Sequence, residues 1–160
     1  MASVLFVCTA NVCRSPMASA IYRLLLDESG ITAGWKVESA GTWAIDGMAV
    51  SSGSVQVMRE RGVDIGNHVA RNVNEELLAS FDLILTMEKG HKEALRIEFP
   101  KSADRIYLVS EMAGSAHDIH DPIGGPVSDY EAAAQELSRL LNKGFDRIVS
   151  LSTRDLIDEH

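Results

Sequence analysis

The sequence predicts a single α/β domain, residues 1–160, with a parallel sheet at its centre. Short apolar runs alternate along the chain with segments of helical periodicity, which is typical of strands joined by crossover helices. The first apolar run, Val4-Leu5-Phe6-Val7, is continuous, as expected for a strand that is covered on both faces. With 160 residues, 46% of them apolar, the chain can bury one hydrophobic core without a metal or a disulfide.

The expected elements follow in order. After the first strand, Ser15-Pro16 offers a helix N-cap and a proline at the first helical position, and Gly30 ends that helix. Its apolar residues share one face, which we expect to be buried: Met17, Ile21, Leu24 and Leu25. Further strands are expected at 35–40, 81–87 and 105–109. Further helices are expected at 55–61, 75–80 after an Asn74 cap, 88–97, and 128–141 after a Ser128 or Asp129 cap, with another to about 151. Residues 110–127 show no regular period, and a loop of that length is usually functional.

Charge and composition exclude several classes of function. Fifteen Lys and Arg against 23 Asp and Glu give a net charge of −8, which disfavours nucleic acid and anionic membranes as partners. No apolar run approaches the roughly 20 residues of a membrane span, and the N-terminus lacks the basic region of a signal peptide. The two cysteines, Cys8 and Cys13, are too few for a disulfide scaffold and lack a second pair for zinc. We therefore expect a protein of the reducing cytosol without a structural zinc site, and we expect it to be a monomer.

The loop between the first strand and the first helix carries the chemistry. It runs from Cys8 through Thr9, Ala10, Asn11, Val12 and Cys13 to Arg14 and Ser15, a C-x5-R-S sequence. It joins the carboxyl end of a strand to a helix N-terminus, where free N–H groups favour an anion. The arch can point its amides inward around phosphate oxygens, and Arg14 adds a planar charged fork. These groups favour thiolate over thiol at Cys8, which makes it a candidate nucleophile.

A second feature supports phosphate-ester cleavage. The leaving oxygen of such an ester needs an acid to protonate it. Asp121-Pro122 lies in the irregular segment, where the proline fixes the backbone next to the carboxylate. Asp121 is therefore the leading acid candidate.

At this point the chain resembles the low-molecular-weight protein tyrosine phosphatases over nearly its whole length. Their pattern is C-x-G-N-x-C-R-S-P near the N-terminus, then S-A-G-T, H-x-[AS]-R and a late D-P. Four segments match it in order: Cys8 to Pro16, Ser39-Ala40-Gly41-Thr42, His68-Val69-Ala70-Arg71 and Asp121-Pro122. The resemblance implies a four-stranded parallel sheet with helices on both faces, no cofactor, and a phosphorylated protein as substrate.

The resemblance also implies residue roles. Cys8 forms a cysteinyl-phosphate, Arg14 holds the phosphoryl oxygens, and Asp121 acts first as acid and then as base. Ser15 donates its hydroxyl to the Cys8 thiolate. Asn11 is expected to shape the arch through side-chain hydrogen bonds to Ser15, Ser39 and His68. Cys13 is a candidate redox partner of Cys8, with a buried filler as the alternative.

Three positions depart from the family pattern. Ala10 replaces a glycine, so the arch must avoid, or be strained at, a positive φ at residue 10. Ile123 follows Asp121-Pro122 where the family has an aromatic wall of the substrate slot. The loop after Thr42 does not align with the family pattern, and Trp43 in this loop is a candidate replacement wall, which gives Val12, Trp43 and Ile123 as the expected slot.

Other functions remain open. Phosphoarginine hydrolysis belongs to a branch of the family with threonine at the position of Val12, and the aliphatic side chain here favours phosphotyrosine. Arsenate reduction needs further cysteines downstream, and none follows Cys13. A phosphate-binding module without activity is disfavoured because the nucleophile, the arginine and the acid are all present. A metal site within residues 117–121 has no ligand outside one loop, so solvated histidines are the better interpretation.

Overall fold

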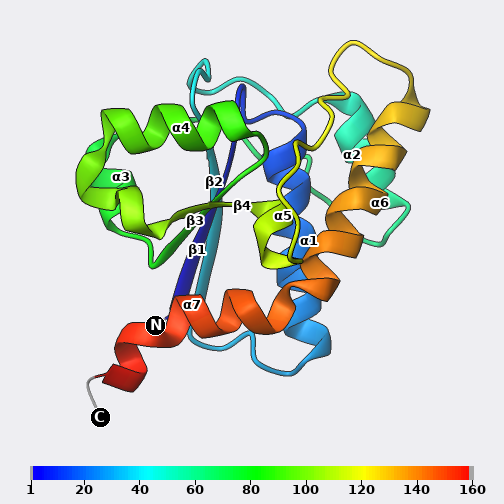
Figure 1. Ribbon diagram of the computed structural model, residues 1–160. Coiled ribbons are helices and arrows are strands. Elements are labelled where there is room, and N and C mark those ends of the chain that lie inside the picture. Colours follow the sequence, from blue (N-terminus) through cyan, green and yellow to red (C-terminus); the bar gives the residue numbers. More distant parts are fainter. Residues whose placement is uncertain (1, 159–160) are drawn as a thin grey trace.

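The computed structural model describes residues 2–158 and confirms the predicted α/β architecture (Figure 1). Four strands form one sheet in the order β2-β1-β3-β4: β1 Ala2–Cys8, β2 Trp35–Gly41, β3 Leu83–Thr86 and β4 Ile106–Leu108. All three pairings are parallel, so the carboxyl ends of the strands meet at one edge. The expected domain, 1–160, also includes Met1, Glu159 and His160, which lie outside the described residues.

Seven α-helices and one 3₁₀ helix connect and flank the strands in this part of the chain. They are α1 Arg14–Glu28, α2 Ser52–Arg59, α3 Glu75–Ala79, α4 Lys89–Glu98, the 3₁₀ helix Pro100–Arg105, α5 Val109–Met112, α6 Val127–Lys143 and α7 Phe145–Asp158. The chain thus alternates between strand and helix, as the sequence predicts.

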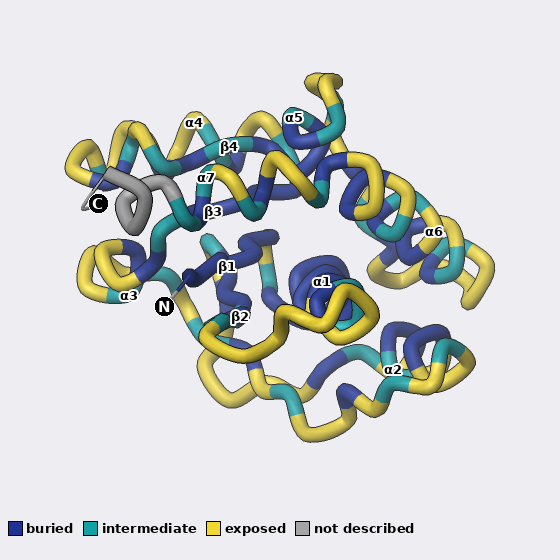
Figure 2. The backbone as a smooth tube through the Cα atoms, turned by 90° about the horizontal axis from the view of Figure 1, so that it is seen from below, coloured by how far each residue is buried: buried dark blue, intermediate teal, exposed yellow. Residues whose placement is uncertain are grey.

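The sheet separates two hydrophobic cores, one on each face. Because successive side chains of a strand point to opposite faces, Val4 and Phe6 of β1 enter one core while Leu5 and Val7 enter the other. The larger core packs β1 and β3 against α1, α6 and α7, and the smaller one packs them against α3 and α4. Figure 2 shows the strands buried between these two layers. The prediction of a first strand covered on both faces is confirmed.

The expected start of α1 is wrong. The helix begins at Arg14 with Cys13 as its N-cap residue, and no side chain caps it. Ser15 is already inside the helix, and its hydroxyl contacts Cys8 and Asn11 instead of a backbone amide. The predicted end is close: α1 stops at Glu28, and Gly30 follows with a φ of 72°, a conformation that glycine adopts without strain.

The buried face of α1 also differs from the predicted one. Met17 and Ile21 are buried as expected, but Leu24 and Leu25 are only partly covered. The last turn instead buries Leu26, which continues a row formed by Ala18 and Tyr22 at intervals of four residues.

The segment that was expected to be irregular begins with a short helix. α5 occupies Val109–Met112, and the following loop is attached to its surroundings at several points. Ile119 donates its amide to the Met87 carbonyl at 2.9 Å, and Asp118 accepts the amide of Lys89 at 2.7 Å. α6 then starts at Val127, after Pro126 rather than after a Ser128 or Asp129 cap. These attachments hold residue 121 near the carboxyl edge of the sheet.

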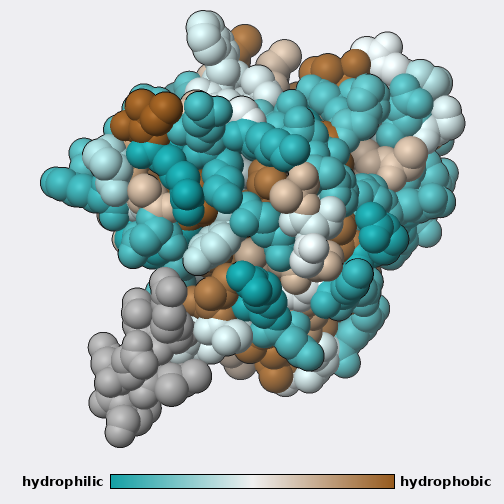
Figure 3. All heavy atoms as spheres, in the orientation of Figure 1, coloured by the Kyte–Doolittle hydropathy of each residue, from teal (hydrophilic) through white to brown (hydrophobic). Residues whose placement is uncertain are grey.

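The visible surface is mostly hydrophilic. Figure 3 shows hydrophobic side chains only as small, separate patches on this face. Within residues 2–158, no helix has both the length and the apolar character that crossing a bilayer requires.

Candidate active site

The loop between β1 and α1 turns its carbonyl groups outward. Four of them accept a hydrogen bond of 2.9 Å from the surrounding chain: Cys8 from Thr42 N, Thr9 from Trp43 N, Asn11 from His68 Nε2, and Val12 from Ser51 N. Within the described residues, the amides of residues 9–14 donate to no protein acceptor. Outward carbonyls and free amides form a nest, which is suited to an anion with several oxygens.

Asn11 gives the loop its turn. Its φ of 58° is the single positive value at a non-glycine residue between residues 2 and 158, and asparagine tolerates this region better than most residues. Its Nδ2 donates to Ser15 Oγ at 2.8 Å and to Ser39 Oγ at 2.9 Å, and its Oδ1 accepts the amide of Arg71 at 3.1 Å. The predicted contacts with both serines are confirmed. The positive φ falls at Asn11 and not at residue 10, so Ala10 in place of glycine causes no strain there.

The expected contact between Asn11 and His68 forms through different atoms. His68 Nε2 lies 2.9 Å from the backbone oxygen of Asn11 and not from its side chain. The reason is that both polar atoms of the Asn11 side chain are already occupied by Ser15, Ser39 and Arg71. Burial lowers the pKa of His68, and the charges of Arg71 and Arg23 lower it further, so the imidazole is neutral at pH 7.

Cys8 lies at the floor of the loop, at the end of β1, and is buried. Its Sγ is 3.0 Å from Ser15 Oγ. Because Ser15 Oγ accepts from Asn11, its own proton is free for another acceptor, and the Ala40 carbonyl is farther away at 3.4 Å. The geometry therefore lets Ser15 donate to a thiolate at Cys8.

Arg14 is held in place over the loop although it is 1% exposed. Its Nη1 donates to the Ile119 carbonyl at 2.7 Å, and its Nη2 lies 2.8 Å from Glu88 Oε2 and 3.5 Å from Asp121 Oδ2. Its Nε is buried and has no partner among the described residues. An unpaired buried donor is costly, and a phosphoryl oxygen bound in the loop would satisfy it.

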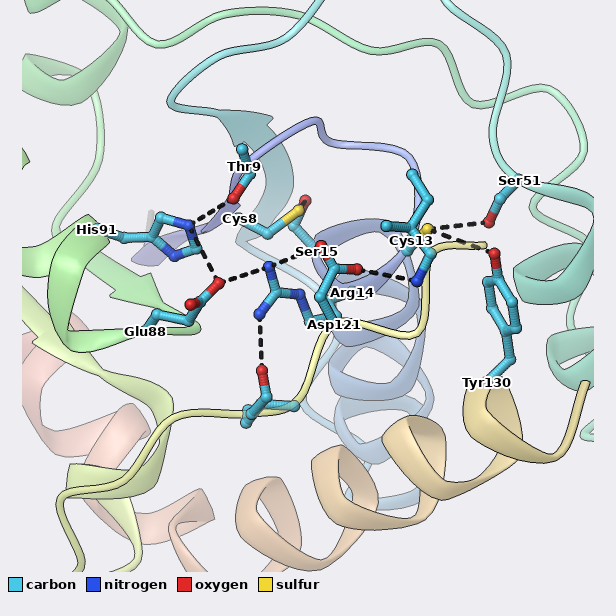
Figure 4. Close-up of polar contacts among 12 residues, drawn as sticks. Cys8, Thr9, Cys13, Arg14, Ser15, Ser51, Glu88, His91, Asp121 and Tyr130 are labelled. Carbon is cyan, nitrogen blue, oxygen red and sulfur yellow. Dashed lines mark hydrogen bonds and ion pairs between the residues drawn. The ribbon is translucent and has the colours of Figure 1, made fainter. Parts of the chain in front are cut away.

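Asp121 lies at the mouth of the same pocket. Its carboxylate is 39% exposed, and Oδ1 accepts the amide of Ile123 at 3.1 Å while Oδ2 faces Arg14 (Figure 4). One carboxylate oxygen is thus used to hold the loop and the other points toward the phosphate position. From this position the Asp121 carboxyl group can give a proton to a leaving oxygen, and because it is partly exposed, water can still enter the pocket.

Cys13 also lines the small pocket at the loop. Its thiol donates to Ser51 Oγ at 3.2 Å, and the Tyr130 hydroxyl is 4.0 Å from the sulfur. Burial raises the pKa of the Cys13 thiol, although Ser51 and Tyr130 oppose that effect. Both cysteines are free and buried.

The expected substrate slot is brought together only in part. The side chains around the small pocket at the loop are Cys8, Ala10, Val12, Cys13, Arg14, Asp121 and Ile123. Val12 and Ile123 therefore give it apolar walls. Trp43 is not among these lining residues: it is 81% exposed on the loop that follows β2, where its amide bonds to Thr9.

Sequence reasoning missed three residues that support the loop. Glu88 is the N-cap residue of α4 and His91 lies in its first turn, and Ser51 is the N-cap residue of α2. Ser51 donates its hydroxyl to the Val12 carbonyl at 3.0 Å. For Glu88 a signal was present, because it follows the expected strand 81–87 and must lie at the carboxyl edge of the sheet. For Ser51 no local pattern indicates a role.

The histidines of the segment 117–121 have separate environments. His117 contacts Glu136 of α6 at 2.7 Å and Ser115 at 2.7 Å, whereas His120 is exposed. Within the described part of the chain, no three side chains of His, Cys, Asp or Glu gather as a metal site requires. His117 connects the loop to α6 through Glu136, while its side chain stays 39% exposed to solvent.

A parallel α/β sheet that presents a buried cysteine, an anion nest, an arginine and a carboxylate at its carboxyl edge defines a cysteine-based phosphatase. Residues 3–151 match the family model for low molecular weight phosphotyrosine protein phosphatases. The chain belongs to this family.

Its relatives act on more than one phosphorylated residue. A protein-arginine-phosphatase of Bacillus subtilis (strain 168) is 34% identical over 88% of this chain and 92% of its own length. The low molecular weight protein-tyrosine-phosphatase PtpB of Staphylococcus haemolyticus is 38% identical over 88% and 95%. Among solved structures, a low molecular weight protein tyrosine phosphatase from T. tengcongensis is 40% identical, with a TM-score of 0.86 over 92% of this chain and 99% of that one. The chain is thus a hydrolase of phosphorylated protein substrates.

Proposed function

We propose that the protein hydrolyses phosphotyrosine in protein substrates through a cysteinyl-phosphate on Cys8. The observation that carries the proposal is the convergence of Cys8, Arg14 and Asp121 on one small pocket beneath free backbone amides. The phosphoryl group would lie in the nest, with two of its oxygens facing Arg14 Nε and Nη2.

In the first step the Cys8 thiolate attacks phosphorus and the bond from phosphorus to the phenol oxygen breaks. Asp121 gives its proton to that oxygen, so that tyrosine leaves as a neutral phenol. The nest and Arg14 stabilise the charge on the equatorial oxygens as it develops. The products of this step are tyrosine and the cysteinyl-phosphate.

In the second step the Asp121 carboxylate takes a proton from water, and the water oxygen attacks phosphorus. The bond between sulfur and phosphorus breaks and the thiolate leaves, accepting the hydrogen bond that Ser15 is placed to donate. Inorganic phosphate is released and Asp121 is protonated again, as the next cycle requires.

The walls of the pocket support an aryl phosphate as substrate. Val12 is buried at the loop, and Ile123 lines the same pocket with 55% of its surface exposed. An aromatic ring would gain apolar contact with both side chains. A guanidinium, by contrast, carries several donors that Val12 cannot accept, and unpaired donors in a pocket reduce affinity.

The second candidate is phosphoarginine hydrolysis, favoured by the similarity to protein-arginine-phosphatases of Bacillus subtilis and Geobacillus stearothermophilus. Two peptides of the same sequence, one with phosphotyrosine and one with phosphoarginine, would separate the candidates. We expect kcat/KM to be at least about 10-fold higher on phosphotyrosine, and Val12→Thr to narrow the ratio. Higher kcat/KM of the unmodified enzyme on phosphoarginine would overturn our proposal in favour of the second candidate.

We further propose that the protein works as a monomer in the reducing cytosol. Two free cysteines on the catalytic loop support this location, because an oxidising compartment would inactivate a thiolate nucleophile. Sedimentation at the mass of a single chain and recovery of the activity in the cytosolic fraction are the expected results.

A further inference from the structure

α4 begins directly beside the loop of residues 8–15 between β1 and α1, which we call the phosphate loop. β3 pairs with β1 so that Thr86 lies opposite Val7, and the Met87 amide donates to the Val7 carbonyl at 3.1 Å. The next residue, Glu88, is the N-cap of α4, and His91 follows three residues later in the first turn. Residues at this spacing lie on the same side of a helix, which here is the side toward the loop.

His91 lies between two parts of the site, the start of the phosphate loop at Thr9 and the Glu88 carboxylate beside Arg14. Its Nε2 lies 2.8 Å from Thr9 Oγ1 and 3.5 Å from Glu88 Oε2, and that Glu88 oxygen lies 2.8 Å from Arg14 Nη2. Figure 4 shows the carboxylate of Glu88 between the imidazole and the guanidinium. The contacts form an unbroken chain from the residue after the nucleophile to the arginine over the phosphate position.

We propose that His91 is a positioning residue, which fixes Thr9 at the start of the phosphate loop and, as a neutral imidazole, leaves Glu88 free to hold Arg14. The inference rests on the proposed phosphatase chemistry, because it assigns a role to the loop and its arginine. An arginine binds two phosphoryl oxygens only when the plane of its guanidinium is fixed, and Glu88 holds one of the two Nη atoms. A small shift of the loop would misplace its amides as well.

The charges around His91 favour the neutral imidazole that this role needs. Burial lowers its pKa most strongly, and the charge of Arg14 lowers it further; Glu88, Asp118 and Asp121 raise it. A protonated ring would attract the Glu88 carboxylate and compete with Arg14 for it. A neutral ring holds Thr9 and leaves Glu88 to the arginine.

Three variants test the proposal. His91→Ala removes the contact, and His91→Gln places an amide nitrogen close to the position of the imidazole Nε2. Lys92→Ala is the matched control, since it removes an ion pair of the same helix, with Glu111, that does not touch the loop. The readouts are kcat and KM on 4-nitrophenyl phosphate, the burst amplitude, which counts competent sites, and the inhibition constant of inorganic phosphate.

We expect His91→Ala to lower kcat/KM about 10-fold and to weaken inhibition by phosphate, with a burst amplitude near one per chain. His91→Gln should recover activity to within about threefold, and Lys92→Ala should match the unmodified enzyme. The positioning role would be overturned if kcat/KM of His91→Ala fell only in proportion to the burst amplitude, that is, to the number of competent sites. Equal losses of kcat/KM in His91→Ala and His91→Gln would also overturn it. If the unmodified enzyme shows no turnover, the proposed function fails, and phosphate affinity measured by calorimetry still tests His91.

Discussion

Ser15 Oγ and Cys8 Sγ lie 3.0 Å apart. Because Ser15 Oγ accepts a hydrogen bond from Asn11 Nδ2, the Ser15 hydroxyl can donate its own proton to the sulfur. This relationship joins the helix that follows the phosphate loop to the strand that precedes it. It matters most when the sulfur carries a negative charge, that is, when the thiolate leaves the phosphoenzyme.

Ser15→Ala should therefore slow breakdown of the cysteinyl-phosphate more than its formation. We expect kcat to fall about 10- to 100-fold, the range for a hydrogen bond to a charged group, while a burst of nitrophenol persists. Rapid mixing with 4-nitrophenyl phosphate measures both phases, and Cys8→Ser is the control that should show neither. Loss of the burst in Ser15→Ala, with the fold intact, would contradict this role.

Asp121→Asn should lower the rate about 10²- to 10⁴-fold on aryl phosphates with basic leaving groups, the usual range for a general acid. On 4-nitrophenyl phosphate the loss should be smaller, because nitrophenolate leaves without a proton. A plot of log kcat/KM against leaving-group pKa should be steeper for the variant. Parallel plots would indicate that Asp121 only holds the loop through Ile123.

Arg14→Lys should reduce kcat/KM at least about 10²-fold even though the charge is kept. Lysine offers a point charge, whereas the guanidinium presents Nε and Nη2 to phosphate while Nη1 holds the Ile119 carbonyl. Inhibition by inorganic phosphate should weaken in the same variant. An activity within about threefold of the unmodified enzyme would exclude a two-point contact.

Stability should fall as the pH drops below about 6.5. Burial lowers the pKa of His68 and of His91 from 6.5, so in that range the unfolded chain binds more protons than the folded one. Their contribution is fully present above pH 6.5 and is lost as the pH falls toward the folded pKa values. Urea unfolding at pH 7.5 and 5.5 measures the change, and His68→Gln should show a shallower dependence than the unmodified protein.

Peroxide should inactivate the enzyme, and a dithiol should restore it. Cys8 lines the pocket at the loop, and as a thiolate it is the group that forms a sulfenic acid, with peroxide as oxidant; the Cys13 thiol then attacks that sulfur, forms a disulfide and releases water. Cys13→Ser should keep its activity but fail to recover after the same exposure. Equal recovery with and without Cys13 would leave it as a filler that contacts Ser51 and Tyr130.

Local sequence determined the fold class and the reacting groups. The continuous apolar run before Cys8, the fixed spacing from Cys8 to Arg14 and the Asp121-Pro122 pair each lie within a few residues, where backbone sterics and periodicity act directly. The order of strands and helices followed from the same short-range patterns. The start of α1 did not, because the hydroxyl that could cap it contacts Cys8 instead.

The resemblance implied Ser39 and His68 as distant supports of the loop, but only the tertiary structure added Ser51, Glu88 and His91. The contact between Thr9 and His91 spans 82 residues, and that between Asn11 and His68 spans 57. Residues so far apart in the chain leave no local sequence pattern that indicates their contact. The sequence therefore did not show that His68 contacts a backbone oxygen, or that His91 contacts the loop. Both arise because parallel strands place their carboxyl ends at one edge, which brings the segments after β1, β2 and β3 together around a single anion site.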